Sequence, residues 1–150
     1  MQHDETQCWR LLRRVLPQHT DHAGVMWHGA YLAWLEEARV EALQQAGLAY
    51  AELSRAGLEL PVVNLAIQYR QSLLHGDLVE LRSWVLPRQG LKLPWRTEFR
   101  CGTTVAAEAQ VELVLVELAA GGQRRLLRRP PAELGQAIDR LQQGPATRQP

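Results

Sequence analysis

The amino-acid sequence predicts an α+β fold in which one long helix packs against an antiparallel sheet. Three observations indicate this fold. Residues 28–48 place apolar side chains at helical spacing, segments with strand-like alternation follow one another from residue 60 to residue 129, and an amphipathic pattern closes the chain. Strands that succeed one another without intervening helices form an antiparallel sheet and not a doubly wound parallel one.

The long helix lies in the first third of the chain. Residues 8–17 are expected to form a strand that ends at Pro17, and residues 18–27 form a loop rich in turn formers and histidines. The helix then covers residues 28–48, because small and apolar side chains recur every three or four positions. Gly47 occupies the position after a helix end where φ is positive.

The expected sheet strands occupy the rest of the chain. In order, the elements are a short helix at 50–55, strands at 60–72, 78–86, 93–101 and 105–118, a last strand ending at Arg129, and a helix after Pro130-Pro131. The strand at 105–118 has the clearest alternation, with apolar residues at odd positions and Glu or Gln among the even ones. One face of the sheet is therefore expected to be buried. A symmetric dimer would cover the surfaces that one helix leaves open.

Composition indicates one globular domain over residues 1–150, with a core at about 8–141 and a polar C-terminal tail. Seventeen Lys and Arg against sixteen Asp and Glu argue against a nucleic-acid-binding surface. Cys8 and Cys101 form no disulfide framework and fit no zinc spacing. The chain has no apolar run of membrane-spanning length and no signal peptide at its start, so we expect a cytoplasmic protein without a membrane partner.

The chemistry is expected in the loop that leads into the long helix. Three of the five histidines and one carboxylate lie between Gln18 and Tyr31. The start of a helix offers unpaired backbone N–H groups and a partial positive charge, which stabilise a developing oxyanion. Asp21 would act as the base or nucleophile, and the backbone N–H near His28 would polarise a carbonyl.

The same residues resemble a known family. The segment TDHAGVMWHGAYLAWLEEAR, residues 20–39, resembles the signature of the hotdog-fold 4-hydroxybenzoyl-CoA thioesterase family, with its Asp, Gly, His, Tyr, Glu and Ala-Arg in register. The likeness continues through LPVVNLAIQYRQSLLHGDLVELRSWV, residues 60–85, and the order of elements agrees over residues 8–129. It implies a hotdog fold, an antiparallel sheet of five to six strands wrapped around one long central helix, and an acyl-CoA thioesterase activity.

The resemblance also implies roles for single residues. Asp21 matches the catalytic aspartate, and His28 matches the residue whose backbone N–H binds the thioester oxygen. Glu36 and Arg39 match the E-x-A-R of the helix, with a structural or interface role. The residues expected to contact substrate are Gly24, Trp27, Gly29, Tyr31, Asn64 and Ser72.

The chain departs from the family pattern in two places. It lacks the proline that many members have near Ser72, and it carries Asn64 where relatives often have a different polar residue. Both positions are expected where a partner subunit would meet the acyl group, so they bear on the substrate and not on the reaction type.

For substrate and partners, the resemblance implies an acyl-CoA that is cleaved without a cofactor by a homo-oligomer, a dimer or a dimer of dimers. The strand that begins at Leu60 is similar to that of proteins hydrolysing 1,4-dihydroxy-2-naphthoyl-CoA in phylloquinone or menaquinone synthesis. A short-chain or hydroxybenzoyl-type thioesterase, a hotdog hydratase, and a non-catalytic acyl-CoA-binding module are the alternatives. Hydratases would require a His-led loop, whereas this loop is led by Asp21.

Two features have both a functional and a purely structural interpretation. His19, Asp21, His22 and His28 could form a metal cluster, but their spacing matches no common zinc pattern. We expect His19, His22 and His75 on the surface or at an interface. Four arginines could hold the phosphates of CoA or could protect a solvated edge strand, namely Arg124, Arg125, Arg128 and Arg129.

Overall fold

The computed structural model describes residues 7–145, and its elements follow the predicted α+β order. The helices are α1 (His28–Gln45), α2 (Tyr50–Arg55) and α3 (Ala132–Gln143), and a 3-10 turn, η2, spans Pro17–His19. The strands are β1 (Trp9–Arg14), β2 (Leu58–Glu59), β3 (Val62–Tyr69), β4 (Leu78–Val85), β5 (Leu93–Cys101), β6 (Thr104–Leu113), β7 (Val116–Leu118) and β8 (Arg124–Leu126).

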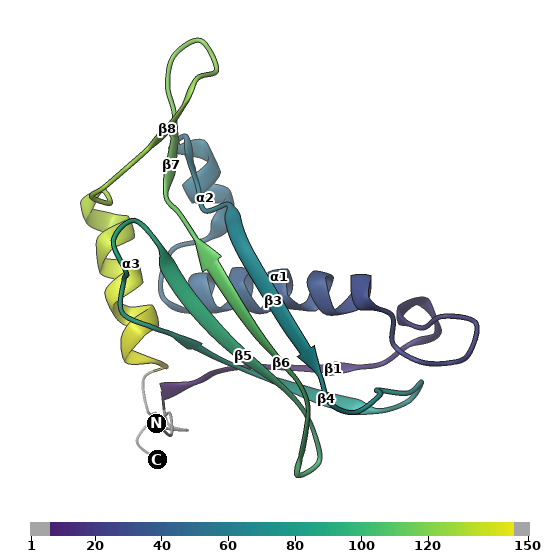
Figure 1. Ribbon diagram of the computed structural model, residues 1–150. Helices are drawn as coiled ribbons and strands as arrows, with labels where there is room; N and C mark the ends of the chain where they lie inside the picture. The colour runs from purple at the N-terminus through teal and green to yellow at the C-terminus, as the bar shows by residue number, and fades with distance from the viewer. Residues whose placement is uncertain (1–6, 146–150) are drawn as a thin grey trace.

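Five strands form one antiparallel sheet in the order β1-β4-β5-β6-β3, and the sheet curves around α1 (Figure 1). This is the predicted hotdog arrangement. A separate small sheet, β2-β7-β8, extends from its end. α3 covers the end of the sheet where β4 finishes (Figure 1). Within residues 7–145 no helix is both long and apolar enough to cross a membrane.

Three strands are shorter than the sequence suggested. The segment predicted as one strand over 105–118 divides into β6 and β7, which belong to different sheets. The alternation stops at Leu113, because the next three side chains are also buried as the chain crosses between the sheets. The strand predicted at 60–72 is β3 alone, Val62–Tyr69, which begins after Pro61, a residue without an N–H for a ladder. The first strand ends at Arg14, so Pro17 opens η2 instead of closing the strand.

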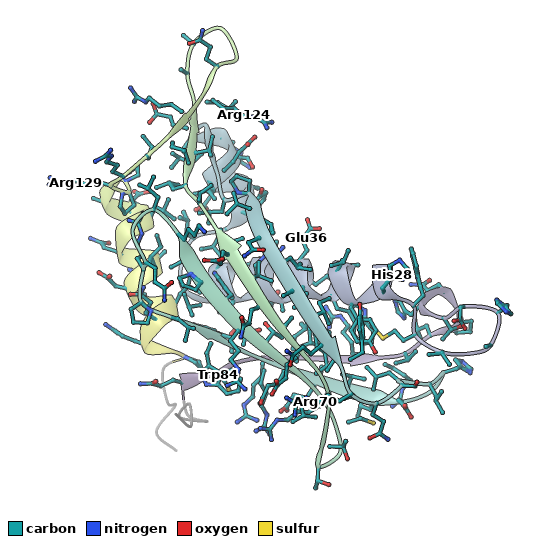
Figure 2. The ribbon with its side chains drawn as sticks, viewed as in Figure 1. His28, Glu36, Arg70, Trp84, Arg124 and Arg129 are labelled. Carbon is teal, nitrogen blue, oxygen red and sulfur yellow. The ribbon has the colours of Figure 1, made fainter. Side chains whose placement is uncertain are left out.

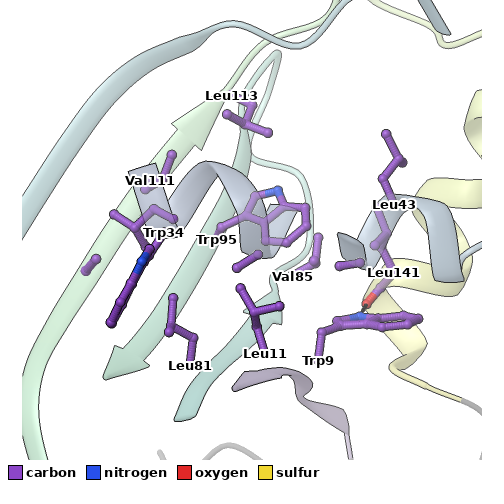
Figure 3. Packing of buried hydrophobic residues seen from close by; sticks show 14 of the residues in the cluster. Trp9, Leu11, Trp34, Leu43, Leu81, Val85, Trp95, Val111, Leu113 and Leu141 are labelled. Carbon is purple, nitrogen blue, oxygen red and sulfur yellow. Dashed lines mark hydrogen bonds between the residues drawn. The ribbon is translucent and has the colours of Figure 1, made fainter. Parts of the chain in front are cut away.

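The core lies between α1 and the concave face of the sheet (Figure 3). Trp34 and Leu35 of α1 face strand residues such as Leu81 and Val111, and all are almost completely buried. Alanines at positions 38 and 42 lie on the same buried side of α1, where their size allows close packing. Trp9, predicted to be core, is buried, and its Nε1–H donates to the Leu141 carbonyl at 2.9 Å, which ties β1 to α3.

The two surfaces left outside this core differ in character. The convex face of the sheet carries ion pairs, including Arg96 with Glu108 at 3.2 Å and Arg70 with Glu108 at 2.7 Å. The edge strand β3 carries exposed apolar side chains on the other face, among them Leu65 and Tyr69. β3 pairs only with β6 among the strands of the described chain, so its outer edge offers unpaired backbone groups.

Candidate active site at the start of the long helix

The loop before α1 is a tight hairpin that Asp21 and Val25 close. Asp21 N–H donates to the Val25 carbonyl at 2.9 Å, and Gly24 N–H donates to the Asp21 carbonyl at 3.0 Å. Gly24 has φ of 78°, a left-handed conformation that residues with a Cβ adopt at a cost. The hairpin therefore explains why a glycine follows Asp21 by three positions.

The two carboxylate oxygens of Asp21 differ in their contacts: one is hydrogen-bonded within the hairpin and the other is not. Oδ1 accepts hydrogen bonds from the backbone N–H of Ala23 at 2.9 Å and of Val25 at 3.1 Å. No residue between 7 and 145 bonds to Oδ2, and the side chain is exposed. The first oxygen fixes the hairpin, and the second is available for chemistry.

The hairpin is hydrogen-bonded to the segment after β3, and the residue before α1 is hydrogen-bonded to η2. Met26 N–H donates to the Leu73 carbonyl at 2.8 Å, and His75 N–H donates to the Gly24 carbonyl at 3.2 Å. Trp27 N–H donates to the His19 carbonyl at 3.1 Å, immediately before α1 begins. The loop is thus held between the segment after β3 and the tip of α1.

The tip of α1 has backbone donors without acceptors. Neither His28 N–H nor Gly29 N–H bonds to any residue of the described chain, and Trp27 supplies no side-chain cap. α1 has 18 residues, so its aligned peptide dipoles add a partial positive charge at this end. These two N–H groups are therefore free to bind an anion, and the helix tip remains a candidate oxyanion site.

Trp27 covers the first turn of α1. A Cβ added to Gly29 would lie 2.3 Å from Cη2 of Trp27, so the indole occupies the space that a larger side chain would need. The Trp27 indole also meets the His28 ring edge-on at 5.2 Å, and it is 47% exposed. A larger residue at position 29 would therefore require the indole to move.

A cleft of about 280 Å³ lies beside this tip, lined by Val25, Met26, Tyr31, Tyr69, Arg70, Gln71 and Ser72. Tyr31 stacks edge-on against Tyr69 and against Phe99, both at 5.0 Å between ring centroids. Burial, with a smaller contribution from Tyr69, raises the pKa of Tyr31 to about 12. Its hydroxyl therefore stays neutral and can donate a hydrogen bond at any physiological pH.

The predicted site residues lie in three adjoining parts of the chain, and Asp21 and His28 do not line the cleft itself. Tyr31 and Ser72 line the cleft, while the hairpin and the helix tip contribute Asp21, Gly24, Trp27, His28 and Gly29. Asn64 lies elsewhere in the same chain: its Nδ2 donates to Glu112 at 2.8 Å on the convex face of the sheet. Tyr69 and Arg70 were not predicted, although alternation from Ile67 places Tyr69 on the buried face of β3.

Among residues 7–145, the histidines other than His28 have structural or surface positions. His19 Nδ1 accepts the Leu16 N–H at 3.0 Å, and its ring packs edge-on against Trp34 at 5.2 Å. His22 and His75 are exposed, as expected. Across residues 7–145, no group of three or more His, Cys, Asp or Glu side chains is arranged to hold a metal ion.

The arginine-rich segment lies far from this cleft in one chain. Figure 2 shows Arg124 and Arg129 at one side of the molecule and His28 at the other. Arg124 pairs with Glu59 at 3.7 Å and Arg125 with Glu117 at 3.2 Å, both at the surface of the small sheet. These pairs fit the interpretation of a charged edge strand, so a phosphate role would require a neighbouring subunit.

An antiparallel sheet that curves around one central helix (Figure 1) is the hotdog fold, which solved thioesterases share. Comparison with known protein families agrees: the sequence of residues 15–139 matches the family described as the thioesterase-like superfamily. The chain belongs to that superfamily, and it is a thioester hydrolase.

Relatives and solved structures extend the comparison. A Synechocystis sp. protein named as a candidate esterase is 35% identical over 141 residues, which cover 92% of this chain and 83% of that protein. The 1,4-dihydroxy-2-naphthoyl-CoA hydrolase of Prochlorococcus marinus is 35% identical over 114 residues, covering 69% and 74%. The DHNA-CoA thioesterase of Staphylococcus aureus superposes with a TM-score of 0.79 at 24% identity, covering 90% and 91%, which shows the shared fold.

Proposed function

We propose that this thioesterase hydrolyses an aromatic acyl-CoA, with 1,4-dihydroxy-2-naphthoyl-CoA as the first candidate, in phylloquinone or menaquinone synthesis. One observation carries the proposal for the site: Asp21 has one unbonded carboxylate oxygen on a hairpin fastened to a helix whose first N–H groups have no acceptor. The aromatic substrate is supported by the Prochlorococcus relative and by the rings of Tyr31 and Tyr69 in the cleft.

The reaction requires little acid assistance, because a thioester carbonyl is weakly resonance-stabilised and a thiolate leaves readily. The carbonyl oxygen binds at the N–H groups of His28 and Gly29, which stabilise the negative charge of the tetrahedral intermediate. Asp21 Oδ2 either attacks the carbonyl carbon or removes a proton from a water that attacks it. In the first route the C–S bond breaks, CoA leaves as thiolate, and water then hydrolyses the acyl-aspartate anhydride. Both routes give the acid and CoA.

Each further predicted residue has a defined task in this scheme. Gly24 permits the turn that returns Asp21 to the helix, and Gly29 leaves room for the indole of Trp27. The indole of Trp27 lies over the first turn of α1 and forms one side of the proposed oxyanion site. Tyr31 and Ser72 supply hydroxyl groups along the cleft that receives the acyl group.

We also propose that the enzyme acts as a dimer, or as a dimer of dimers. The free edge of β3 exposes large apolar side chains, with Val63 51% and Tyr69 54% exposed. Pairing two β3 strands would satisfy the open backbone groups and bury these side chains. Asn64, on the same strand, would then lie close to the partner subunit. Light scattering coupled to size exclusion tests this, and a monomer at all concentrations would contradict it.

The activity is tested by thiol release from a panel of CoA thioesters. The panel contains 1,4-dihydroxy-2-naphthoyl, 4-hydroxybenzoyl, benzoyl and short aliphatic acyl groups. The naphthoyl ester is expected to give the highest kcat/KM, and Asp21→Asn is expected to lower kcat by about 10²–10⁴-fold. A preference for short aliphatic esters would refute the aromatic substrate. Equal rates for wild type and Asp21→Asn would refute the role of Asp21.

A further inference from the structure

The turn that precedes β4 supports the hairpin that carries Asp21. Figure 1 shows the hairpin and the turn at the same end of the molecule, although they are far apart in the sequence. Within the hairpin, Thr20 and Met26 form an antiparallel bridge, and Val25 forms a second antiparallel bridge with Leu74. The segment around Leu74 therefore lies beside the hairpin as a further extended strand.

Leu74 lies between the hairpin and Asp77. The two hydrogen bonds that flank the Val25–Leu74 bridge are made by the N–H groups of Met26 and His75. Because these neighbours make the bonds, the N–H and carbonyl of Leu74 itself point away from the hairpin. Asp77 bonds to both groups: its Oδ2 accepts the Leu74 N–H at 2.8 Å, and its N–H donates to the Leu74 carbonyl at 3.0 Å. Asp77 thus fixes Leu74 from the side opposite the hairpin.

Asp77 itself is anchored to the core. Its carbonyl accepts the Val15 N–H at 2.8 Å, and the neighbouring Gly76 N–H donates to the Val15 carbonyl at 2.9 Å. Val15 is completely buried. Arg14 Nη1 adds a hydrogen bond to the Gly76 carbonyl at 2.8 Å. A continuous series of hydrogen bonds therefore leads from Val15 through Asp77 and Leu74 to the hairpin.

The Asp77 carboxylate is the one member of this series that a substitution can remove. The other bonds from Val15 to the hairpin join backbone groups, whereas the bond to the Leu74 N–H depends on the side chain at position 77. Leu73 is buried and fixes the start of the segment, but the side chains of Leu74 and His75 are exposed and contribute little packing. The position of the later part of the segment therefore depends on Asp77.

We propose that Asp77 is a positioning residue for thioester hydrolysis: its carboxylate holds Leu74, and Leu74 holds the hairpin that places the Asp21 carboxylate. The inference rests on the proposed role of Asp21. Asp77 acts through geometry and not through its charge, because it supplies an acceptor for one backbone N–H. A displacement of about 1 Å in a catalytic group can lower a rate by about 10²-fold, so loss of this bond is sufficient to affect turnover.

The test compares three substitutions of Asp77 in thiol release from the CoA ester that wild type hydrolyses fastest. Asp77→Asn keeps an acceptor oxygen without the charge, and kcat is expected to stay within about twofold of wild type. Asp77→Ala removes the acceptor, and kcat is expected to fall by about 10–100-fold while KM changes by less than about threefold. Asp77→Glu keeps the charge but moves the carboxylate outward by one methylene, and kcat is expected to fall by about tenfold. Glu117→Ala, the matched control, removes a surface carboxylate on β7 and leaves kcat unchanged.

Hydrogen exchange gives a measurement that does not depend on turnover. The amides of Met26 and His75, which flank the bridge, are expected to exchange roughly tenfold faster in Asp77→Ala than in wild type, and at the wild-type rate in Asp77→Asn. The amide of Lys92, bonded in the turn between β4 and β5, is the internal control and keeps its rate in all variants. If Asp77→Ala does not fold, Asp77→Glu replaces it in both measurements.

A double mutant shows whether Asp77 acts through Asp21. In an Asp21→Asn background, Asp77→Ala is expected to cause no further loss of the residual rate, because the hairpin no longer carries the carboxylate. The proposal is overturned if Asp77→Ala keeps the wild-type kcat or the wild-type exchange rates, if Asp77→Asn loses as much activity as Asp77→Ala, or if the loss is equally large in the Asp21→Asn background. Wild-type activity of Asp21→Asn would instead refute the proposed function, and the exchange rates of Met26 and His75 would still decide whether Asp77 holds the hairpin.

Discussion

The two ends of α1 present hydrogen-bond donors in opposite ways. At its start, the donors are backbone N–H groups of His28 and Gly29 beside an open cleft. Further along, they are the side chains of Arg39 and Trp95, which come from different elements and are buried in apolar surroundings. Backbone donors at a helix tip are inherent in the helix and are solvated until substrate arrives. Buried side-chain donors must have a partner or destabilise the fold.

Asp21 gives the largest expected effect and separates catalysis from folding. In Asp21→Asn the amide oxygen can still accept the hydrogen bonds of Ala23 and Val25, so the unfolding free energy should change little while kcat falls by about 10²–10⁴-fold. Asp21→Ala should lose activity to the same extent and about 1 kcal/mol of stability, because both hydrogen bonds are removed. Thiol release and urea unfolding measure the two effects. Equal stability of the two variants would contradict the structural role of Oδ1.

Tyr31 should make the cleft sensitive to alkali. The pKa of Tyr31 is about 12 in the folded protein and 10.0 as its ordinary value, so the unfolded chain loses the proton first as pH rises. Stability is then complete below pH 10 and falls between pH 10 and 12, by up to about 2–3 kcal/mol. Tyr31→Phe should remove this part of the decline in urea midpoints measured across the same range. An identical decline in both proteins would contradict the prediction.

Gly29 tests whether the indole of Trp27 really covers the helix tip. Alanine is normally about 1 kcal/mol better than glycine inside a helix. Here, the added Cβ would meet the indole at 2.3 Å, so Gly29→Ala should destabilise the protein by about 1–3 kcal/mol. In a Trp27→Ala background the same change should become neutral or stabilising. A double-mutant cycle by thermal unfolding measures this, and additive effects would show that the indole does not lie over Gly29.

Arg39 should give the smallest effect and the opposite sign. Its side chain is half-buried with Nη1 buried, and it has no ion pair in the described chain, so Arg39→Met should leave stability unchanged or raise it by about 1 kcal/mol. Arg13→Met is the matched control, because Arg13 pairs with Glu37 of α1 at 2.9 Å on the surface and should lose less than about 1 kcal/mol. Strong destabilisation by Arg39→Met would mean that the arginine has a structural partner.

The sequence predicted the start of α1 well because the relevant residues are close together in the chain. The spacing from Tyr31 onward defines the helix, and Gly47, with φ of 99°, ends it as expected. The Asp21-to-Gly24 loop folds through its own hydrogen bonds, so its position beside the helix follows from local chemistry.

The remaining features depend on contacts between distant segments. Tyr69 reaches the cleft only because β3 is the edge strand beside α1, and no local pattern specifies that neighbour. Asn64 is on the opposite face of the same strand, where Glu112 binds it. The pairing of Arg39 with Trp95 in one pocket likewise requires α1 and β5 to pack together, which alternation alone does not determine.

The different roles of the two Asp21 carboxylate oxygens have an evolutionary consequence. The hairpin requires only an acceptor oxygen at Oδ1, whereas the proposed hydrolysis requires a negatively charged Oδ2. A single nucleotide substitution converts an aspartate codon to an asparagine codon. One such event would turn this hydrolase into a silent carrier of acyl-CoA with an unaltered backbone, so homologues of identical shape can differ in whether they catalyse at all.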